Sequence, residues 1–307
     1  MYASAPRLAG LRFAVAGPGR VGASLAHWAA AAGAQPVAVA GRTSGAATAD
    51  LSARLGAAAV SLAALETGGL DLLLLALPDG CLAGAARSLA GRPQARVVLH
   101  CSGSRGADVL APLAAAGSAV GALHPLKAFP SALPDPREAC GVFFALDGDP
   151  EAVSLARRLV AGWGGEAAVV PAVARSAYHL AASLAAGGTV TLLAAADELA
   201  RRLGLPAEVG RGYAALARGA LAAAGAAPSP ALGLTGPVAR GETGLVLAQL
   251  EELRGLYPEL VPLAVELGLE TLRRLERQGP LGPEHQRLRR ALVAQPPGRA
   301  EPPPQPR

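Results

Sequence analysis

The sequence predicts an α/β protein, with a doubly wound parallel sheet at the N-terminal side and an all-α domain after it. Two observations carry this prediction. Short apolar runs alternate with Ala-rich, helix-like stretches up to about Pro171, and runs of this length are typical of strands buried on both faces. After Pro171 the strand-like runs stop, and long helical segments follow. Alternation of strand and helix indicates a parallel sheet.

The expected strands are taken from the apolar runs in chain order. They lie within residues 11–17, 36–42, 71–79, 95–103, 119–126, 141–148 and 166–171. The stretches at 22–33 and 80–90 are expected to be crossover helices. Together they predict a first domain over residues 1–171.

The second domain is expected to be helical over residues 172–278. Its predicted helices cover residues 173–203, 206–224, 243–253 and 257–277. Gly204 is typical of the position after a helix end, and Pro206 is typical of a helix start. Residues 279–307 are rich in Pro, Gln and Arg. We expect them to form a largely disordered tail, preceded by a short helix at 283–293.

Composition and charge limit the class of protein. Net charge is +5, of which the segment from Glu284 onward contributes +3, and no basic stripe interleaved with aromatic residues occurs. We therefore expect no nucleic-acid partner. The three cysteines are widely spaced and form no C-x-x-C pair, so we expect reduced thiols in a cytoplasmic protein and no metal site. We also expect no signal peptide and no apolar run long enough to span a membrane.

A glycine motif follows the first predicted strand. Gly17, Gly19 and Gly22 form G-x-G-x-x-G between the run Leu11 to Ala16 and the following helix. In a chain with 38 glycines the spacing alone could be accidental, but its place between strand and helix favours a Rossmann dinucleotide site. Gly17 would allow the tight turn, Gly19 the approach of the pyrophosphate, and Gly22 close packing of helix on strand.

The end of the second strand indicates which dinucleotide binds. An NAD site usually has an acidic residue there, whereas this chain has Arg42, Thr43 and Ser44. A guanidinium and two hydroxyls are better partners for a 2′-phosphate. We therefore expect NADP, with NAD less favoured. The alternative is that Arg42 is an ordinary exposed loop residue.

Polar residues gather at the ends of the later strands, where such sheets bind ligands. His100 and Ser102 follow one strand; His124 and Lys127, the only lysine of the chain, follow the next. On the first helix of the second domain, Arg175, His179 and Ser183 share one face. For each histidine and for Lys127 the alternative is a packed, hydrogen-bonded or solvated residue without a chemical role.

Six motifs in order resemble a known family. They are AGPGRVG, ALPDG, LHCSGS, LHPLKAFP, RSAYHLAASLAAGG and LTGPVARGET. The chain resembles Rossmann-like proteins that carry the helical domain DUF2520. They are related to ketopantoate reductases, pyrroline-5-carboxylate reductases and 6-phosphogluconate-dehydrogenase-like enzymes. The resemblance covers the chain to about Arg277. It implies an NADP-binding Rossmann domain, then a helical domain like the C-terminal domain of 6-phosphogluconate dehydrogenase, which dimerises through its helices.

The resemblance also implies site residues. It places Gly17, Gly19, Arg20, Val21 and Gly22 at the pyrophosphate, and Leu77, Pro78 and Asp79 beside the cofactor. The residues it implies in or near the cleft are Ser102, His124, His179, Thr235, Gly236, Pro237 and Arg240. The chain departs from its relatives at two positions. Gly187 stands where relatives often have an Asn. The hydroxyacid dehydrogenases have a catalytic lysine on the matching helix, where the nearest basic residue of this chain is Arg175. An arginine does not readily donate a proton at neutral pH.

These observations lead to one expected function and two alternatives. We expect an NADP-dependent reductase or dehydrogenase that transfers hydride to or from a C=O or C=N carbon of a small anionic substrate. The expected proton donor is His179, with His124 second. Ser102 would bind the substrate or the nicotinamide amide, Tyr178 and Thr235 would shape the pocket, and Arg240 would hold a carboxylate. The alternatives are a non-catalytic NADP-binding sensor and a purely structural helical dimeriser.

Overall fold

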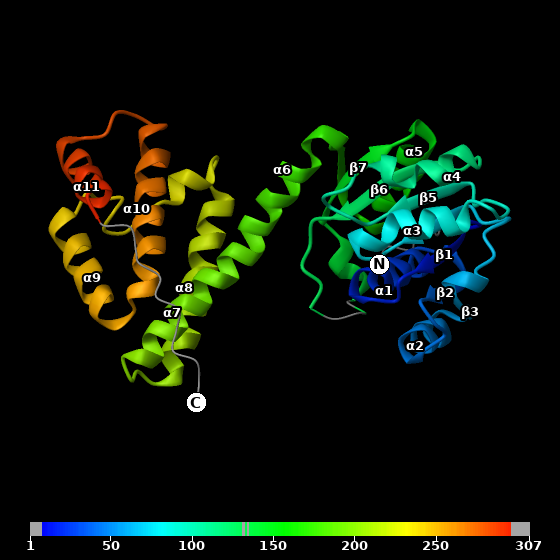
Figure 1. Cartoon of the computed structure of the whole chain (residues 1–307), viewed down its shortest axis with the longest axis horizontal. Coiled ribbons are helices and arrows are strands. Elements are labelled where there is room, and N and C mark those ends of the chain that lie inside the picture. Colours follow the sequence, from blue (N-terminus) through cyan, green and yellow to red (C-terminus); the bar gives the residue numbers. More distant parts are fainter. Residues whose placement is uncertain (1–7, 131–132, 134, 296–307) are drawn as a thin grey trace, which may run out of the picture. The chain divides into compact units, whose positions relative to one another are not determined.

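A computed structural model of the chain describes residues 8–130, 133 and 135–295. It divides into two compact units, Met1–Ala186 and Gly187–Arg307 (Figure 1). The sequence placed the boundary after residue 171, whereas contacts within the structure place it after Ala186. The first helix of the expected helical domain is therefore part of the α/β unit.

The α/β unit is built on one eight-stranded sheet in the order β3-β2-β1-β4-β5-β6-β7-β8. The strands are β1 (Arg12–Ala16), β2 (Gln35–Gly41), β3 (Ala58–Ser61), β4 (Leu72–Leu75), β5 (Val97–His100), β6 (Ala119–Pro125), β7 (Phe143–Gly148) and β8 (Glu166–Val169). The order of the first six is that of a Rossmann sheet. All seven expected runs contain a strand, which confirms the predicted fold class.

Two features of the sheet differ from the expectation. β3, at the sheet edge, was not predicted, because AAVS is short and has no buried residue. β7 runs antiparallel to β6, whereas β8 is parallel to β7. The sheet is therefore mostly parallel, as in the predicted doubly wound fold, with one antiparallel pair.

Helices cover both faces of the sheet (Figure 1). They are α1 (Arg20–Ala31), α2 (Ala46–Leu55), α3 (Asp79–Leu89), α4 (Ala111–Ala115) and α5 (Pro150–Trp163). One apolar core packs α1, α2 and α5 against one face, with Trp28 and Trp163 at its centre. A second core packs α3 and α4 against the other face. Burial on both faces explains why the strands are continuous apolar runs.

One helix of 31 residues, Ala172–Arg202, consists of α6 (Ala172–Ser183), a π-helical segment η4 (Leu184–Gly188) and α7 (Thr189–Arg202). By length and composition alone it could cross a membrane, since an 18-residue window within it has a mean hydropathy of 1.4. The side chain of Arg175 in α6 is nevertheless fully buried and contacts the sheet, so the start of this helix belongs to the α/β unit.

The helical unit contains, besides α7, the helices α8 (Ala207–Ala226), α9 (Thr243–Leu256), α10 (Val261–Glu276) and α11 (Pro283–Val293). Its core joins α9, α10 and α11 through Val246, Leu250, Leu272, Leu288 and Leu292. Because α11 supplies two of these buried residues, the ordered unit continues beyond the expected boundary at residue 278. The last expected tail residues, 296–307, lie outside the described residues.

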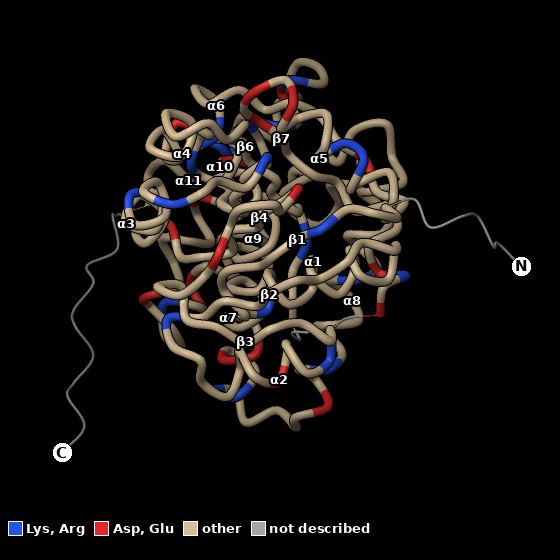
Figure 2. Tube along the Cα trace, turned by 90° about the vertical axis from the view of Figure 1, so that its right-hand side faces the viewer, with Lys and Arg blue, Asp and Glu red and all other residues tan. Residues whose placement is uncertain are grey.

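Charged residues of both signs are interspersed along the trace. In the view of Figure 2, short basic and acidic segments alternate over the described part of the chain. Many of them form exposed pairs one helical turn apart, such as Arg54 with Asp50.

Candidate active site

The glycine turn between β1 and α1 has the geometry that its sequence motif suggests. Gly17 has a φ of +98°, and a Cβ there would lie 2.8 Å from the carbonyl carbon of Ala76. A Cβ on Gly22 would overlap the carbonyl oxygen of Gly17 and lie 2.8 Å from the Cβ of Ala76. A Cβ on Gly19 would meet no heavy atom within 4 Å. Gly17 and Gly22 are thus required by the fold, whereas Gly19 leaves its backbone open to a ligand at the start of α1.

A cavity of about 520 Å³ lies beside this turn. It is lined at the carboxyl ends of β1, β4, β5 and β6 and by His179 of α6. It brings together many of the predicted residues: Gly17, Gly19, Arg20, Val21, Leu77, Pro78, Asp79, Ser102, His124, Lys127 and His179. The cavity thus joins the glycine motif to the polar residues at the strand ends.

His124 and His179 line one side of the cavity, whereas Tyr178 does not line it but contacts His124. Nδ1 of His124 lies 3.0 Å from the hydroxyl of Tyr178. The ring of His124 also packs edge-on against the ring of His179, with centroids 5.6 Å apart. Nδ1 of His179 is buried and has no hydrogen-bond partner in the described part of the chain. This cluster, from β6 and α6, places two imidazole rings at the cavity wall.

Burial keeps the His124 ring neutral at physiological pH. Desolvation, followed by the nearby His179 and Arg175, lowers the pKa of His124 to about 4. A neutral imidazole carries one N–H donor and one acceptor nitrogen, and the hydrogen bond at one nitrogen determines the role of the other. The hydrogen bond between Tyr178 and Nδ1 of His124 therefore determines whether Nε2 of His124 is a donor or an acceptor.

Gly103 allows this cluster to form, and the sequence reasoning did not include it among the site residues. Gly103 is buried in the loop after β5. A Cβ there would overlap Nδ1 of His179 and would lie 2.7 Å from Nε2 of His124. Nothing in the local sequence signals this need, because both histidines come from distant segments.

Ser102 and Asp79 are tied to the same loop. The buried Oγ of Ser102 accepts hydrogen bonds from the backbone N–H groups of Ser104 and Arg105, at 3.2 and 3.1 Å. The Ser104 hydroxyl donates to the Asp79 carboxylate at 2.5 Å. Burial raises the pKa of Asp79, but the hydroxyls of Ser104 and Ser102 and the charge of Arg105 outweigh it and lower the pKa overall. The cavity wall thus carries a carboxylate beside the start of α3.

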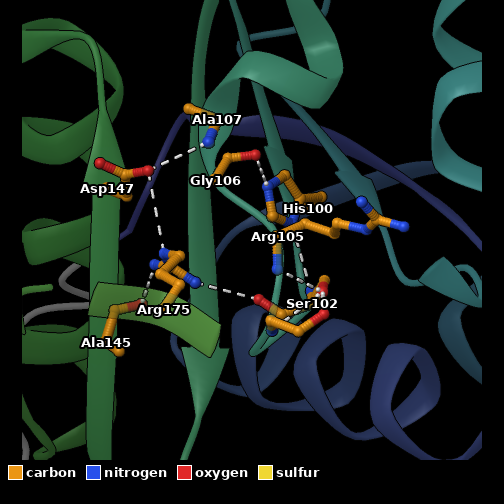
Figure 3. Close-up of polar contacts among 9 residues, drawn as sticks. His100, Ser102, Arg105, Gly106, Ala107, Ala145, Asp147 and Arg175 are labelled. Atoms are coloured by element: carbon orange, nitrogen blue, oxygen red, sulfur yellow. Dashed lines mark hydrogen bonds and ion pairs between the residues drawn. The ribbon is translucent and has the colours of Figure 1, made fainter. Parts of the chain in front are cut away.

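His100 is a buried part of the framework (Figure 3). Its Nδ1 accepts from the backbone N–H of Ser102 at 3.2 Å, so its Nε2–H donates to the carbonyl oxygen of Gly106 at 3.0 Å. Burial lowers the pKa of His100 to about 4. Both ring nitrogens are occupied and the ring is fully buried, which agrees with the structural alternative considered for this residue.

Arg175 connects α6 to the sheet (Figure 3). Its guanidinium donates to the carbonyl oxygens of Ser102 and Ala145, at 3.0 and 3.2 Å, and its Nε lies 3.8 Å from the carboxylate of Asp147. Asp147 also accepts from the backbone N–H of Ala107 at 3.0 Å. Burial lowers the pKa of Arg175, and Asp147 opposes that shift. Arg175 thereby positions Tyr178 and His179 on the next turn of α6.

Several other predicted residues do not line this cavity. Arg42, Thr43 and Ser44 are exposed in the loop between β2 and α2. Thr235 and Arg240 lie in the helical unit, where Arg240 is paired with Glu242 at 2.7 Å.

Lys127 does line the cavity and is paired with Glu138 at 3.1 Å. Among the described residues, no group of three or more His, Cys, Asp or Glu side chains could hold a metal ion.

Two family models match successive segments of this chain. The model of a Rossmann-like domain matches residues 3–125, and that of a domain of unknown function, DUF2520, matches residues 142–271. No curated protein sequence matches significantly.

Three solved structures have a similar fold at low sequence identity. Protein TM1727 from Thermotoga maritima has a TM-score of 0.70 at 20% identity, over 87% of this chain and 99% of that one. A candidate NADP oxidoreductase from Bacteroides fragilis, BF3122, gives the same values. A reductive aminase from Aspergillus terreus, in complex with NADPH and ethyl levulinate, has a TM-score of 0.52 at 19% identity over 92% of each chain. The two family models match successive segments of the sequence, so the chain joins a Rossmann-like domain to a DUF2520 domain.

Proposed function

We propose that this protein is an NADP-dependent oxidoreductase that transfers hydride to or from a C=O or C=N carbon of a small, anionic substrate. The observation that carries the proposal is the shared cavity of about 520 Å³. On one side it has the open glycine turn at the start of α1, and on the other the His124–Tyr178–His179 cluster. A dinucleotide bound at the glycine turn would therefore lie next to a substrate bound beside the histidines.

The residues of the turn fit a dinucleotide. Gly19 has free space in front of its backbone, and the N-terminus of α1 carries the partial positive charge that favours phosphate. Arg42, Thr43 and Ser44 are exposed beyond β2 and would hold a 2′-phosphate, which supports NADP over NAD. The names of the structures from B. fragilis and A. terreus, which mention NADP and NADPH, support the same choice.

When bound, the nicotinamide would supply or accept the hydride, and side chains of the protein would donate or accept the proton. His179 is the proposed proton donor, since its Nδ1 has no partner in the described chain and its side chain lines the cavity. His124 would donate a hydrogen bond as a neutral ring. Ser102 would orient the substrate or the nicotinamide amide.

An anionic substrate is supported by the cations around the cavity. Arg20 and Lys127 both line it. Lys127 is paired with Glu138, so Arg20 is the cation with which a substrate carboxylate would pair. The roles of Arg240 and Thr235, the cytoplasmic location and a homodimer formed through the helical domain are parts of the same proposal that come from the sequence.

Calorimetric titration of the full chain with NADPH and NADH tests the cofactor. We expect tighter binding of NADPH, and Arg42→Ala should remove most of that preference. Gly19→Ala should weaken both ligands, whereas Gly84→Ala, at a position in α3 where a Cβ meets nothing within 4 Å, should weaken neither. Absence of binding by either dinucleotide would refute the proposal.

A panel of small carbonyl compounds and imines then tests the reaction. With a substrate found, His179→Ala should lower turnover by roughly 10²–10⁴ and leave NADPH affinity nearly unchanged. NADPH binding without any hydride transfer would favour the non-catalytic sensor instead.

A further inference from the structure

The turn between β2 and α2 is fastened to the α/β unit by a buried threonine. Residues 42–47 are all exposed, whereas Thr48, in the first turn of α2, is only 2% exposed. The hydroxyl of Thr48 donates a hydrogen bond to the carbonyl oxygen of Thr43 at 3.1 Å. Thr48 therefore ties the middle of an exposed turn to a buried position on the helix that follows it.

The same hydroxyl closes the space beside Gly41, the last residue of β2. A Cβ on Gly41 would overlap Oγ1 of Thr48 and would lie 2.6 Å from the carbonyl oxygen of Thr43. Neither atom can give way easily, because Oγ1 belongs to a short, buried side chain and the carbonyl belongs to the backbone. Position 41 therefore accepts only glycine while Thr48 is in place.

Position 41 matters for the choice of cofactor. In sheets of this kind, an NAD site has an acidic side chain at the end of the second strand, where it binds the 2′-hydroxyl of the ribose. In this chain β2 ends at Gly41, and Thr48 and Thr43 fill the space in which an acidic side chain would begin. The contact between β2 and α2 thus excludes the acid by packing.

We propose that Thr48 is a positioning residue for the choice of cofactor. Its side chain keeps an acidic residue out of position 41, and its hydrogen bond holds residues 42–44 where a 2′-phosphate would bind. This inference rests on the proposed function and names a buried residue that supports the preference for NADP. Thr48 acts through Gly41 and Thr43.

Two physical effects would produce the preference. Excluding the acid removes the partner that the ribose 2′-hydroxyl of NADH would need, and it also removes a negative charge that would repel a 2′-phosphate. Fixing the carbonyl of Thr43 holds the turn that carries Arg42, Thr43 and Ser44. A turn that is already ordered loses less conformational entropy when it binds a phosphate.

The first test compares Thr48→Val with Thr48→Ser by calorimetric titration of the full chain. Valine keeps the size of the side chain but donates nothing to Thr43, whereas serine keeps the hydroxyl. We expect Thr48→Val to weaken NADPH binding at least about tenfold, since a hydrogen bond to a charged group contributes about that factor, and to leave NADH binding unchanged. Thr48→Ser should keep the wild-type preference.

Thr67→Val is the matched control for a purely structural effect. Thr67 is also 2% exposed, and its hydroxyl also donates to a backbone carbonyl, that of Pro93. It lies before the amino end of β4, at the opposite end of the strands from the glycine turn. Thr67→Val should lower the melting temperature and leave the ratio of NADPH to NADH affinity unchanged.

The second test addresses the exclusion of the acid. Gly41→Asp should lower the melting temperature and should bind NADH no more tightly than the wild type, because its side chain has no space. Gly41→Asp/Thr48→Ala removes the overlapping hydroxyl and releases the carbonyl of Thr43. We expect this double variant to bind NADH at least about tenfold more tightly than Gly41→Asp does. Equal NADH affinity of the two variants would overturn the inference.

The titrations separate this inference from the proposed function. A wild type that prefers NADPH, with the same preference in Thr48→Val, would overturn the inference and leave the proposed function intact. Equal weakening of NADPH and NADH in Thr48→Val would also overturn it, because that result means a structural role only. A wild type that binds neither dinucleotide would instead refute the proposed function.

Discussion

Replacing Arg175 by methionine should destabilise the α/β unit by an amount that the structure allows us to work out. The change keeps most of the side-chain volume but removes the donors to Ser102 and Ala145 and leaves the carboxylate of Asp147 without its cation. Breaking a buried ion pair by removing one partner lowers the free energy of unfolding by about 3 kcal/mol. With a urea dependence of about 2 kcal/mol per molar for a unit of this size, the midpoint should fall by roughly 1.5 M.

Tryptophan fluorescence makes the measurement specific to this unit. The chain has two tryptophans, and both Trp28 and Trp163 are buried in the core beside the sheet. The control is Arg54→Met, which removes an exposed pair with Asp50 and should leave the midpoint unchanged. A midpoint that falls by less than about 0.5 M in Arg175→Met would correspond to less than about 1 kcal/mol, and would refute the assigned role of the buried guanidinium.

Three further predictions address the turn, the pH dependence and the helical unit. Gly22→Ala should lower the melting temperature, because its Cβ overlaps the carbonyl of Gly17, whereas Gly19→Ala should melt like the wild type; equal melting of both would contradict the described packing. The depressed pKa of His100, about 4 when folded against 6.5 when unfolded, means that the unfolded state binds more protons between these values. The stability from neutral His100 is therefore complete above pH 6.5 and is lost as pH falls to 4, by about 3 kcal/mol. Urea midpoints at several pH values should show a flatter profile for His100→Gln, and an unchanged slope would argue against this origin. Leu288→Ala should lower the free energy of unfolding of the helical unit by about 2–5 kcal/mol, measured by circular dichroism; no loss would mean that α11 does not belong to the core.

The sequence was informative where one short segment decides its own structure. Buried strands and the glycine turn are local patterns, and each was found at the predicted place. The start of α10 was less well predicted: Tyr257 precedes a proline, which disfavours helical backbone at that residue, and the helix begins at Val261 after a short 3₁₀ turn.

Other features depend on contacts between distant segments. The antiparallel direction of β7 leaves no mark on a strand buried on both faces. The need for glycine at position 103 depends on histidines at 124 and 179. From the sequence, Arg175 was only the basic residue nearest to the position of the catalytic lysine in hydroxyacid dehydrogenases. Its burial against Ser102, Ala145 and Asp147 is visible only in the folded unit.

The aromatic cluster around Trp28 has a practical consequence. Trp28 lies on α1, the helix that starts at the glycine turn, and its ring centroid is 6.0 Å from that of Trp163. Neither indole N–H has a hydrogen-bond partner within the described residues, and indoles in such dry surroundings emit at short wavelengths. This emission overlaps the absorption band of reduced nicotinamides. Excitation energy should therefore pass from the indoles to NADPH held on α1, so the protein carries its own optical reporter of the reduced cofactor.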